Sequence, residues 1–330
     1  SFGWVGSVIS SDQFPVVVKL HGPAFLTLVD EGLSREFVQK RIAAEGVGLA
    51  SARVITGPSR CVLSDTLARY ELRPRIKAHV VNPLALHAYA KTWNLESSDR
   101  ATLLFVGRFD KLKGGDRVLL AFKKILQRRR DARLIFVGPD LGMTNADGTR
   151  IHFDAFVESL FSPSERERIT YMGTQPQETI CALRSKAALT LVASRWESQG
   201  YTALEAMLQG CPLICADTSG LSESVVHGET GLLYQGEDID DMVEQVHLLL
   251  GQPELAARLG RSAREHVIAI HSMANVVDRT MEVYRGAIDD FRSAGTEGAR
   301  KGRGSCFRPS GVTERPPRAG SSSNREHSNP

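Results

Sequence analysis

The chain has 330 residues and a formal net charge of +3, with 41 Lys and Arg against 38 Asp and Glu. This near balance argues against nucleic-acid binding as the main function, because no basic excess and no aromatic–basic interleaving appears. The length predicts two domains. The five cysteines lack C-x-x-C spacing and are typical of buried thiols in a reducing compartment. No metal-ligand cluster, signal peptide or transmembrane run is visible, so we expect a cytoplasmic protein, with peripheral contact to an inner membrane left open.

The first hundred residues predict part of an α/β domain. Strands are expected at 14–20, 53–56 and 77–81, and helices at 35–46 and 58–70. We expect Gly46 and Gly48 to end the first of these helices. Residues 85–100 are polar and mixed, and are expected to link this domain, 1–84, to the next. His21 follows the first strand at its carboxyl end, where ligand sites form in α/β sheets; the alternative is a turn histidine without a chemical role.

Residues 101–292 alternate strand and helix, which predicts a parallel sheet with helices on both faces. Strands are expected at 101–106, 132–137, 168–172, 187–192, 212–215 and 231–234, and helices at 115–129, 153–161, 177–185, 200–208, 238–249, 253–270 and 274–291. The composition then changes, and residues 293–330 are rich in Gly, Ser, Pro and Arg. Such a segment buries too little apolar surface to offset the entropy of ordering, so we expect a disordered tail.

A basic turn bracketed by glycines follows the strand expected at 101–106. Gly107 and Arg108 come directly after the strand, and Lys113 and Gly114 precede the next helix. Arg offers a planar fork and Lys a point charge, so the pair suits two phosphates. A generic basic loop is the alternative. The spacing matches neither a Walker loop nor the G-x-G-x-x-G dinucleotide pattern, which argues against a nicotinamide-dependent oxidoreductase.

A pair of glutamates brackets the start of the helix expected at 200–208. Glu197 lies in the loop after a buried strand, Gly200 opens the helix and Glu205 lies within it. A helix N-terminus offers backbone N–H groups to phosphate. One carboxylate can reach the hydroxyls of a sugar and the other those of a ribose, so the arrangement predicts a site for a sugar attached to a diphosphate. The alternative is that both glutamates lie on a solvated helix face.

Taken in order along the chain, these motifs resemble those of the family 4 retaining glycosyltransferases, also called glycosyl transferases group 1, which have the GT-B fold. The matching residues are Gly107-Arg108, Lys113-Gly114, Gly138-Pro139, Glu197-x-x-Gly200, Glu205-Ala206-Met207, Gly210-x-Pro212 and Gly228-Glu-Thr-Gly231. The resemblance is sharp over about 101–290 and weaker over 15–100. It implies an α/β fold of two Rossmann-like parallel-sheet domains, with the last helix crossing back to the first domain. Because the chain opens close to what resembles the middle of that first domain, we expect an N-terminally truncated protein.

The resemblance also implies roles for the site residues. Arg108 and Lys113 would bind the donor diphosphate. Glu197 would hold hydroxyls of the transferred sugar, and Glu205 those of the ribose. His21 would lie across the cleft, near the sugar or the acceptor. The remaining donor-binding positions are Gly107, Gly173 near the nucleotide base, and the backbone amides of Gly200, Tyr201 and Thr202, whereas the catalytic set is Glu197, His21, Arg108 and Lys113.

The implied activity is retaining transfer of a sugar from a nucleotide-diphosphate sugar to a hydroxyl of a carbohydrate, lipid or small-molecule acceptor, in glycan, glycolipid or polysaccharide biosynthesis. No metal or cofactor is expected, because the cations Arg108 and Lys113 would neutralise the leaving diphosphate. Gln199 departs from the family, which has an aromatic residue there, and we expect it to alter the packing of the loop and the sugar pocket. Trp196 is expected either to line that pocket or to pack in a core. A chain with an incomplete first domain is alternatively a non-catalytic remnant that binds the donor and transfers nothing.

Overall fold

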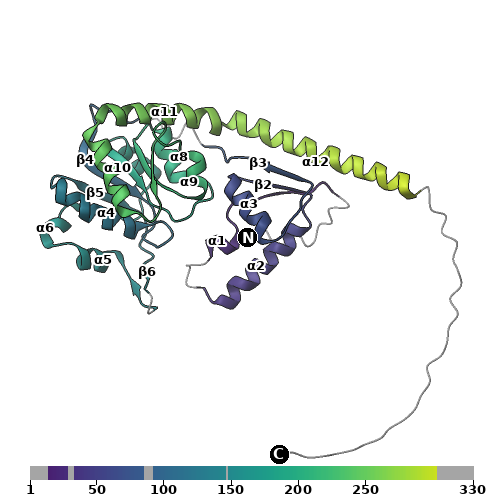
Figure 1. The fold of residues 1–330 in the computed structure, drawn as a ribbon, viewed down its shortest axis with the longest axis horizontal. Helices are drawn as coiled ribbons and strands as arrows, with labels where there is room; N and C mark the ends of the chain where they lie inside the picture. The colour runs from purple at the N-terminus through teal and green to yellow at the C-terminus, as the bar shows by residue number, and fades with distance from the viewer. Residues whose placement is uncertain (1–13, 29–32, 85–91, 146–147, 303–330) are drawn as a thin grey trace, which may run out of the picture. The chain divides into compact units, whose positions relative to one another are not determined.

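The structure, a computed structural model, describes residues 14–28, 33–84, 92–145 and 148–302 (Figure 1). Contacts along the chain define two compact units, Ser1–Asp289 and Asp290–Pro330. The first unit holds every candidate site residue. Its described residues form two parallel sheets and a short antiparallel hairpin.

The smaller sheet is built from three strands that pair in parallel in the order of the sequence: β1 (Val17–Lys19), β2 (Val54–Gly57) and β3 (Ile76–His79). The connections contain the short α1 (Ala24–Thr27), then α2 (Arg35–Ala50) before β2, and α3 (Arg60–Arg69) before β3. Both longer helices begin after a serine, Ser34 or Ser59, whose hydroxyl accepts a backbone N–H of the first turn (3.2 Å in each case). Ile55 of the central strand is inaccessible to solvent.

The prediction that Gly46 and Gly48 end the first helix is wrong, because α2 continues to Ala50. The helix instead uses Gly46 for a close contact. A Cβ atom on Gly46 would lie 2.8 Å from the ring of Tyr70, whose hydroxyl donates a hydrogen bond to Glu45 (2.6 Å). This packing offsets the lower helix propensity of glycine, which is about 1 kcal/mol per residue.

The larger sheet has six parallel strands in the order β11-β10-β9-β4-β5-β8. The strands are β4 (Asp99–Val106), β5 (Arg133–Val137), β8 (Ile169–Tyr171), β9 (Ala187–Val192), β10 (Leu213–Asp217) and β11 (Leu232–Gln235). The helices are α4 (Gly115–Arg128), α5 (Phe153–Leu160), α6 (Pro163–Arg166), α7 (Gln177–Arg184), α8 (Tyr201–Leu208), α9 (Ser219–Ser224), α10 (Ile239–Gly251), α11 (Pro253–His271) and α12 (Met273–Gly302). A hairpin of β6 (Met143–Thr144) and β7 (Arg150–Ile151) follows β5. The expected α/β fold with parallel sheets is confirmed, and every strand expected between 101 and 234 is present.

Side chains alternate between the two faces of this larger sheet. Leu103 and Phe105 of β4 belong to the main buried core together with Val118 of α4. Leu104, which lies between them in sequence, belongs to a separate cluster against which Leu183 of α7 packs. Helices therefore cover both faces, as the alternation of strand and helix in the sequence predicts.

The strand order reverses between β4 and β9. Strands β5 and β8 extend the sheet on one side of β4, whereas β10 and β11 extend it beyond β9 on the other. Open α/β sheets bind ligands at such a switch point, in the crevice outside the carboxyl ends of the strands. The loop 107–114 follows β4 and the loop 193–200 follows β9, so both predicted motifs lie at this switch point.

The last helix is longer than expected. α12 continues through residues 293–302, which the composition assigns to a disordered tail. This stretch contains Ala, Glu, Arg and Lys, which favour helix, and three glycines, which do not. The disorder expected of residues 303–330 stays a prediction, because they lie outside the described residues. Earlier in α12, Val283 belongs to the same buried cluster as Val54 of the smaller sheet.

Gly114 sets the distance between the two loops at the switch point. It is the N-cap of α4 with φ +71°, and a Cβ atom there would overlap the carbonyl oxygen of Ala193. We predict that Gly114→Ala lowers the free energy of unfolding in urea by at least about 1–2 kcal/mol, the cost of a left-handed backbone for an L residue, with the overlap adding to it.

Gly251→Ala is the matched control, because nothing lies within 4 Å of the added atom and alanine favours helix. Its free energy of unfolding should equal or exceed that of the unmodified protein. Equal urea midpoints for the Gly114 and Gly251 variants would show that the two loops are not in contact at Gly114.

Candidate functional site

The loops after β4 and β9 are joined to each other by backbone and side-chain contacts. The N–H of Arg195 donates to the carbonyl of Leu112 (2.8 Å). The Arg195 guanidinium makes two parallel hydrogen bonds to the carboxylate of Asp116 in the first turn of α4 (2.9 and 2.7 Å), a geometry that is specific as well as strong. The two motifs are therefore parts of one structure, joined by a pair of residues that neither motif contains.

Lys113 and Glu197, the predicted ligands of phosphate and of sugar, are in contact. Nζ of Lys113 lies 2.5 Å from Oε1 of Glu197, and the Ser194 hydroxyl donates a hydrogen bond to the same oxygen (2.7 Å). The Glu197 side chain is 12% exposed and that of Lys113 is 28% exposed. Reduced access of water strengthens the attraction between the two charges, so the pair is a fixed feature of the switch point.

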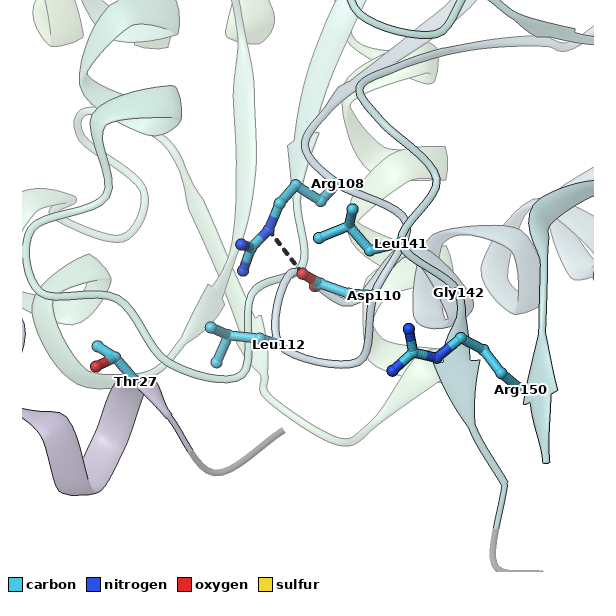
Figure 2. A pocket seen from close by; sticks show the side chains of 7 residues that line it. All are labelled: Thr27, Arg108, Asp110, Leu112, Leu141, Gly142 and Arg150. Atoms are coloured by element: carbon cyan, nitrogen blue, oxygen red, sulfur yellow. Dashed lines mark ion pairs between the residues drawn. The ribbon is translucent and has the colours of Figure 1, made fainter. Parts of the chain in front are cut away.

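Asp110 orients both cations of the basic turn. Its Oδ2 forms an ion pair with Nε of Arg108 (2.7 Å), and its Oδ1 accepts the N–H of Lys113 (2.7 Å). The terminal nitrogens of the Arg108 guanidinium point away from Asp110 (Figure 2), and these are the nitrogens that can grip a phosphate as a fork. Asp110 lies within the basic turn, but no role was predicted for it. Its spacing from Lys113 is a usable signal, since an aspartate commonly accepts a backbone N–H a few residues further on.

A cavity of about 410 Å³ opens beside Arg108. Its lining residues are Thr27, Arg108, Asp110, Leu112, Leu141, Gly142 and Arg150 (Figure 2). Arg150 comes from β7, and its hairpin is fixed by Asp140, whose carboxylate accepts the N–H groups of Gly142 and Phe153 (2.9 Å each). The cavity combines two arginines with apolar walls, a mixture suited to a polar ligand that carries negative charge.

The loop that carries Glu197 rests on α9. The N–H of Glu197 donates to the Ser219 hydroxyl (2.9 Å), and the N–H of Gly220 donates to the Glu197 carbonyl (3.0 Å). Gly200 follows with φ +77°, and a Cβ atom there would overlap Leu221. Only glycine fits this position, so the predicted glycine-opened helix is present. The segment 216–223 therefore supports the loop that carries Glu197.

The helix that follows, α8, carries the predicted backbone amides and the second glutamate. Tyr201 and Thr202 lie in the first turn of α8, where backbone N–H groups have no partner within the helix. Glu205 is 20% exposed and accepts a hydrogen bond from Arg184 (2.8 Å). Neither Glu197 nor Glu205 lies on a solvated helix face, which excludes that alternative.

Three glycines lie in a row at the carboxyl ends of β4, β5 and β8. Gly107 donates its N–H to the carbonyl of Val137, and Gly138 donates to the carbonyl of Gly173 (2.8 Å each). A Cβ atom on Gly138, which has φ +144°, would overlap the carbonyl of Gly107. The space that a Cβ atom on Gly173 would occupy has no atom within 4 Å. The role of Gly173 beside a nucleotide base stays a prediction.

Gln199, the departure from the family pattern, is buried in a hydrogen-bond network. The N–H of Asn82 donates to Gln199 Oε1 (2.9 Å), and Gln199 Nε2 donates to the Asn82 carbonyl (3.3 Å). Nδ1 of His271, the last residue of α11, lies 2.9 Å from the same carbonyl. The Gln199 side chain therefore joins the Glu197 loop to the segment that follows β3 of the smaller sheet. Whether Gln199 alters the loop packing and the sugar pocket relative to an aromatic residue stays a prediction.

Two further candidates lie toward the smaller sheet. Trp196 packs against the buried cluster that contains Leu20 and Ile55, which favours core packing over lining of a sugar pocket. His21 lies exposed in a bend after β1, and no hydrogen bond or ion pair joins it to another described residue. The structure does not bring His21 together with Arg108, Lys113 and the glutamates, so its role stays a prediction.

Most cysteines lie in the core, as expected. Cys181, Cys211 and Cys215 are buried free thiols, whereas Cys306 lies outside the described residues. Burial raises the pKa of the Cys211 thiol to about 11, so it stays protonated and unreactive. In the described ranges, no group of three or more His, Cys, Asp or Glu side chains is placed to hold a metal ion. No helix there is both long and apolar enough to cross a bilayer.

Comparison with known sequences finds relatives over the part of the chain that contains the larger sheet. The sequence profile of the glycosyl transferases group 1 family matches residues 91–266, more than half of the chain. A D-inositol 3-phosphate glycosyltransferase of Nocardia farcinica is 34% identical over 192 residues, which cover 58% of this chain and 41% of that protein. A D-inositol 3-phosphate glycosyltransferase of Catenulispora acidiphila is 26% identical over 304 residues, covering 88% of this chain and 71% of that one. The chain thus spans less than half the length of the first of these relatives.

Comparison with solved structures identifies the fold. Sucrose-phosphate synthase from Thermosynechococcus elongatus has a TM-score of 0.68 at 23% identity, over 87% of this chain and 72% of that one. Anabaena Alr3699/HepE in complex with UDP and glucose has a TM-score of 0.67 at 17% identity, over 86% of this chain and 75% of that one. At such identities the likeness concerns the fold alone, and it confirms the expected GT-B architecture.

The network around Gln199 makes stability depend on pH. His271 is 4% exposed, and burial lowers the pKa of its imidazole below the ordinary value of 6.5, with an opposing hydrogen bond to the Asn82 carbonyl. The nearby histidines His266 and His79 lower this pKa further. Below about pH 6.5 the unfolded chain binds a proton that the folded chain resists, so the free energy of unfolding falls as the pH falls, by up to about 1.4 kcal/mol per pH unit.

We predict that His271→Gln removes this component of the slope between about pH 6.5 and 5. Urea unfolding at several pH values measures it. His152→Gln, a change at an exposed histidine, controls for the loss of one titratable group. Parallel slopes for the unmodified protein and the His271 variant would contradict the assignment.

Proposed function

Because the chain belongs to the glycosyl transferases group 1 family, we propose that it is a retaining, metal-independent glycosyltransferase that moves a hexose from a nucleotide-diphosphate sugar to an acceptor hydroxyl. The contact between Lys113 and Glu197 at the switch point carries this proposal. A cation suited to phosphate and a carboxylate suited to sugar hydroxyls meet there, and a sugar diphosphate needs both at one place. The Anabaena protein of the same fold is described with UDP and glucose bound, which supports a donor of this class.

The leaving group would be a nucleoside diphosphate, and three groups would meet its developing negative charge. Arg108 presents terminal guanidinium nitrogens, Lys113 presents an ammonium, and the first turn of α8 presents backbone N–H groups. Charges and dipoles that are oriented before the reaction commonly make the largest contribution to catalysis. The two cations would supply the positive charge that a metal ion supplies in other phosphate-transfer sites.

Lys113 changes partner in this proposal. Its ammonium is held by Oε1 of Glu197, and a diphosphate offers a more highly charged acceptor. Movement of the ammonium to phosphate frees Oε1 for sugar hydroxyls, while the hydroxyl of Ser194 keeps the carboxylate in place. Glu197 then positions the sugar. The acceptor hydroxyl attacks from the face that the diphosphate leaves, and its proton passes to the departing phosphate oxygen.

We predict that Arg108→Ala lowers kcat by roughly 10²–10³, because the charge on the leaving diphosphate loses one of its partners. Glu205→Ala should raise KM for the donor by roughly ten- to a hundredfold, the effect of losing a hydrogen bond to a charged group. The rate of nucleoside diphosphate release measures both. Arg128→Ala, at an exposed cation of α4 paired with Glu244, is the control and should retain activity. If both site variants kept near-normal kcat and KM, the roles assigned to Arg108 and Glu205 would be wrong.

A second candidate function is donor binding without transfer. The observation behind it is that the smaller sheet has three strands in the described residues. Calorimetric titration with nucleotides alongside a transfer assay separates the two functions. Binding accompanied by turnover supports the enzyme, whereas binding without turnover supports the remnant.

The acceptor end of the proposed site is the cavity beside Arg108. The name of the relatives, D-inositol 3-phosphate glycosyltransferase, describes a polyol that carries a phosphate. Arg150 gives this cavity an exposed cation on a hairpin that Asp140 fixes. We infer that the acceptor is a hydroxyl compound with an anionic group, and that Arg150 contacts that group.

Arg150→Ala should raise KM for D-inositol 3-phosphate by roughly three- to tenfold, as expected for a partly exposed ion pair, and leave KM for the donor unchanged. Transfer to inositol without the phosphate, measured in parallel, should not respond to the substitution. The control is Arg133→Ala, which changes an exposed arginine at the opposite, amino end of β5. An equal effect on both acceptors would contradict recognition of the phosphate.

A further inference from the structure

Arg184 is the last residue of α7, and its side chain is inaccessible to solvent. Its Nη1 donates a hydrogen bond to Oε2 of Glu205 (2.8 Å), and its Nη2 donates to the carbonyl of Thr202 (3.5 Å). Both partners belong to α8. Glu205 is also its only ion-pair partner among the described residues. A buried guanidinium is therefore attached to the helix that begins at the donor site.

Stability alone gives a poor reason for this pair. Removing one partner of a buried ion pair is strongly destabilising, but replacing the whole pair with apolar residues is often neutral. The two side chains of this ion pair also differ in burial, since that of Glu205 is 20% exposed and that of Arg184 is fully buried. The arginine therefore holds the carboxylate from the core side and presents it outward.

One oxygen of the Glu205 carboxylate is left for a ligand. Oε2 accepts the hydrogen bond from Arg184, and no described residue donates to Oε1. Thr202 and Glu205 are three residues apart, so they share a face of α8. Arg184 contacts both of them and so fixes the carboxylate relative to the first turn of the helix.

We propose that Arg184 is a positioning residue for the ribose of the donor. It fixes the rotamer of Glu205 so that Oε1 accepts hydrogen bonds from the ribose hydroxyls, while its second contact holds the carbonyl of Thr202. This inference rests on the proposed function, which assigns the ribose to Glu205. Arg184 itself does not touch the donor, and it acts on recognition of the sugar of the nucleotide rather than on the diphosphate.

Calorimetric titration of the full chain with UDP, GDP and ADP, and with their 2′-deoxy counterparts, tests the inference. The unmodified protein is expected to bind its preferred ribonucleotide roughly 10- to 100-fold more tightly than the 2′-deoxy form, the effect of one hydrogen bond to a charged group. Arg184→Lys and Arg184→Met should each reduce this ratio to about threefold or less, because the carboxylate loses its fixed rotamer. Affinity for the 2′-deoxy form should change little, since the diphosphate contacts remain.

A double variant tests whether the two residues act together. Arg184→Met combined with Glu205→Gln should show the same ribose ratio as Glu205→Gln alone, because residues that act as one unit are not additive. Arg117→Met is the matched control. Among the described residues, Arg117 is the other arginine with a buried side chain (2% exposed); it pairs with Glu237 and donates a hydrogen bond to the carbonyl of Ala193. This control should lower the thermal midpoint of unfolding and leave the ribose ratio unchanged.

An unchanged ratio in folded Arg184 variants overturns the inference. So does an equal loss of affinity for the ribo and deoxy forms, which a merely structural role would give. Thermal unfolding reports whether each variant folds, and if Arg184→Met does not fold, Arg184→Lys decides, because it keeps the charge. Binding by the unmodified protein without preference for ribose also overturns the inference. No binding of any of these nucleotides contradicts the proposed function itself.

Discussion

Where β4 and β9 lie side by side, the chain leaves the sheet in two loops, and both return to one place because Gly114 brings one backbone against Ala193 of the other. The bidentate pair of Arg195 and Asp116 then holds the second loop to α4. The other parts of the site are placed relative to these two loops. The basic turn aims its cations from the first loop, and α8 begins directly after the second. If Gly114 did not lie against Ala193, the charged side chains of the two loops would lie apart at the ends of separate strands and would form no common site.

The site charges of the larger sheet are all held in ion pairs. Arg108 is paired with Asp110, Lys113 with Glu197, and Glu205 with Arg184. An unpaired charge with little access to water is costly, so these pairs let a highly charged site form during folding. They also orient each group before a ligand arrives, and oriented charges stabilise a charged reaction centre better than mobile ones.

Patterns that are local in the sequence allowed the fold and the motifs to be predicted. Apolar runs marked the strands, and the glycines at 107, 114 and 200 marked turns that the structure contains. Two of the orienting pairs escaped prediction because their members are distant in sequence. Asp116 and Arg195 are 79 residues apart, and Arg184 and Glu205 are 21 residues apart. No periodicity or spacing rule relates such residues, since only the packed strands bring them together.

The same limit applies to glycine within helices. Gly46 has the low helix propensity of any glycine, and its value to α2 depends on the ring of Tyr70, which lies against it in the folded chain. Helix propensity alone therefore predicts that α2 ends at Gly46. In the folded chain, packing against Tyr70 allows the helix to continue past this residue. Conversely, Gly114 and Gly200 are required by backbone conformation, which is a local property, and their positions at helix starts follow from the sequence.

The buried amide of Gln199 has a mechanical consequence for the two sheets. Its side chain forms hydrogen bonds with the backbone of Asn82, which lies 117 residues earlier in the chain, in the segment after β3. Any rearrangement that draws these backbones apart leaves polar groups stranded in the interior, at a cost of about 1–3 kcal/mol. Motion at the junction is thereby transmitted to the loop that carries Glu197. By reciprocity, a ligand that immobilises this loop also stiffens the junction, even though it touches neither Asn82 nor His271.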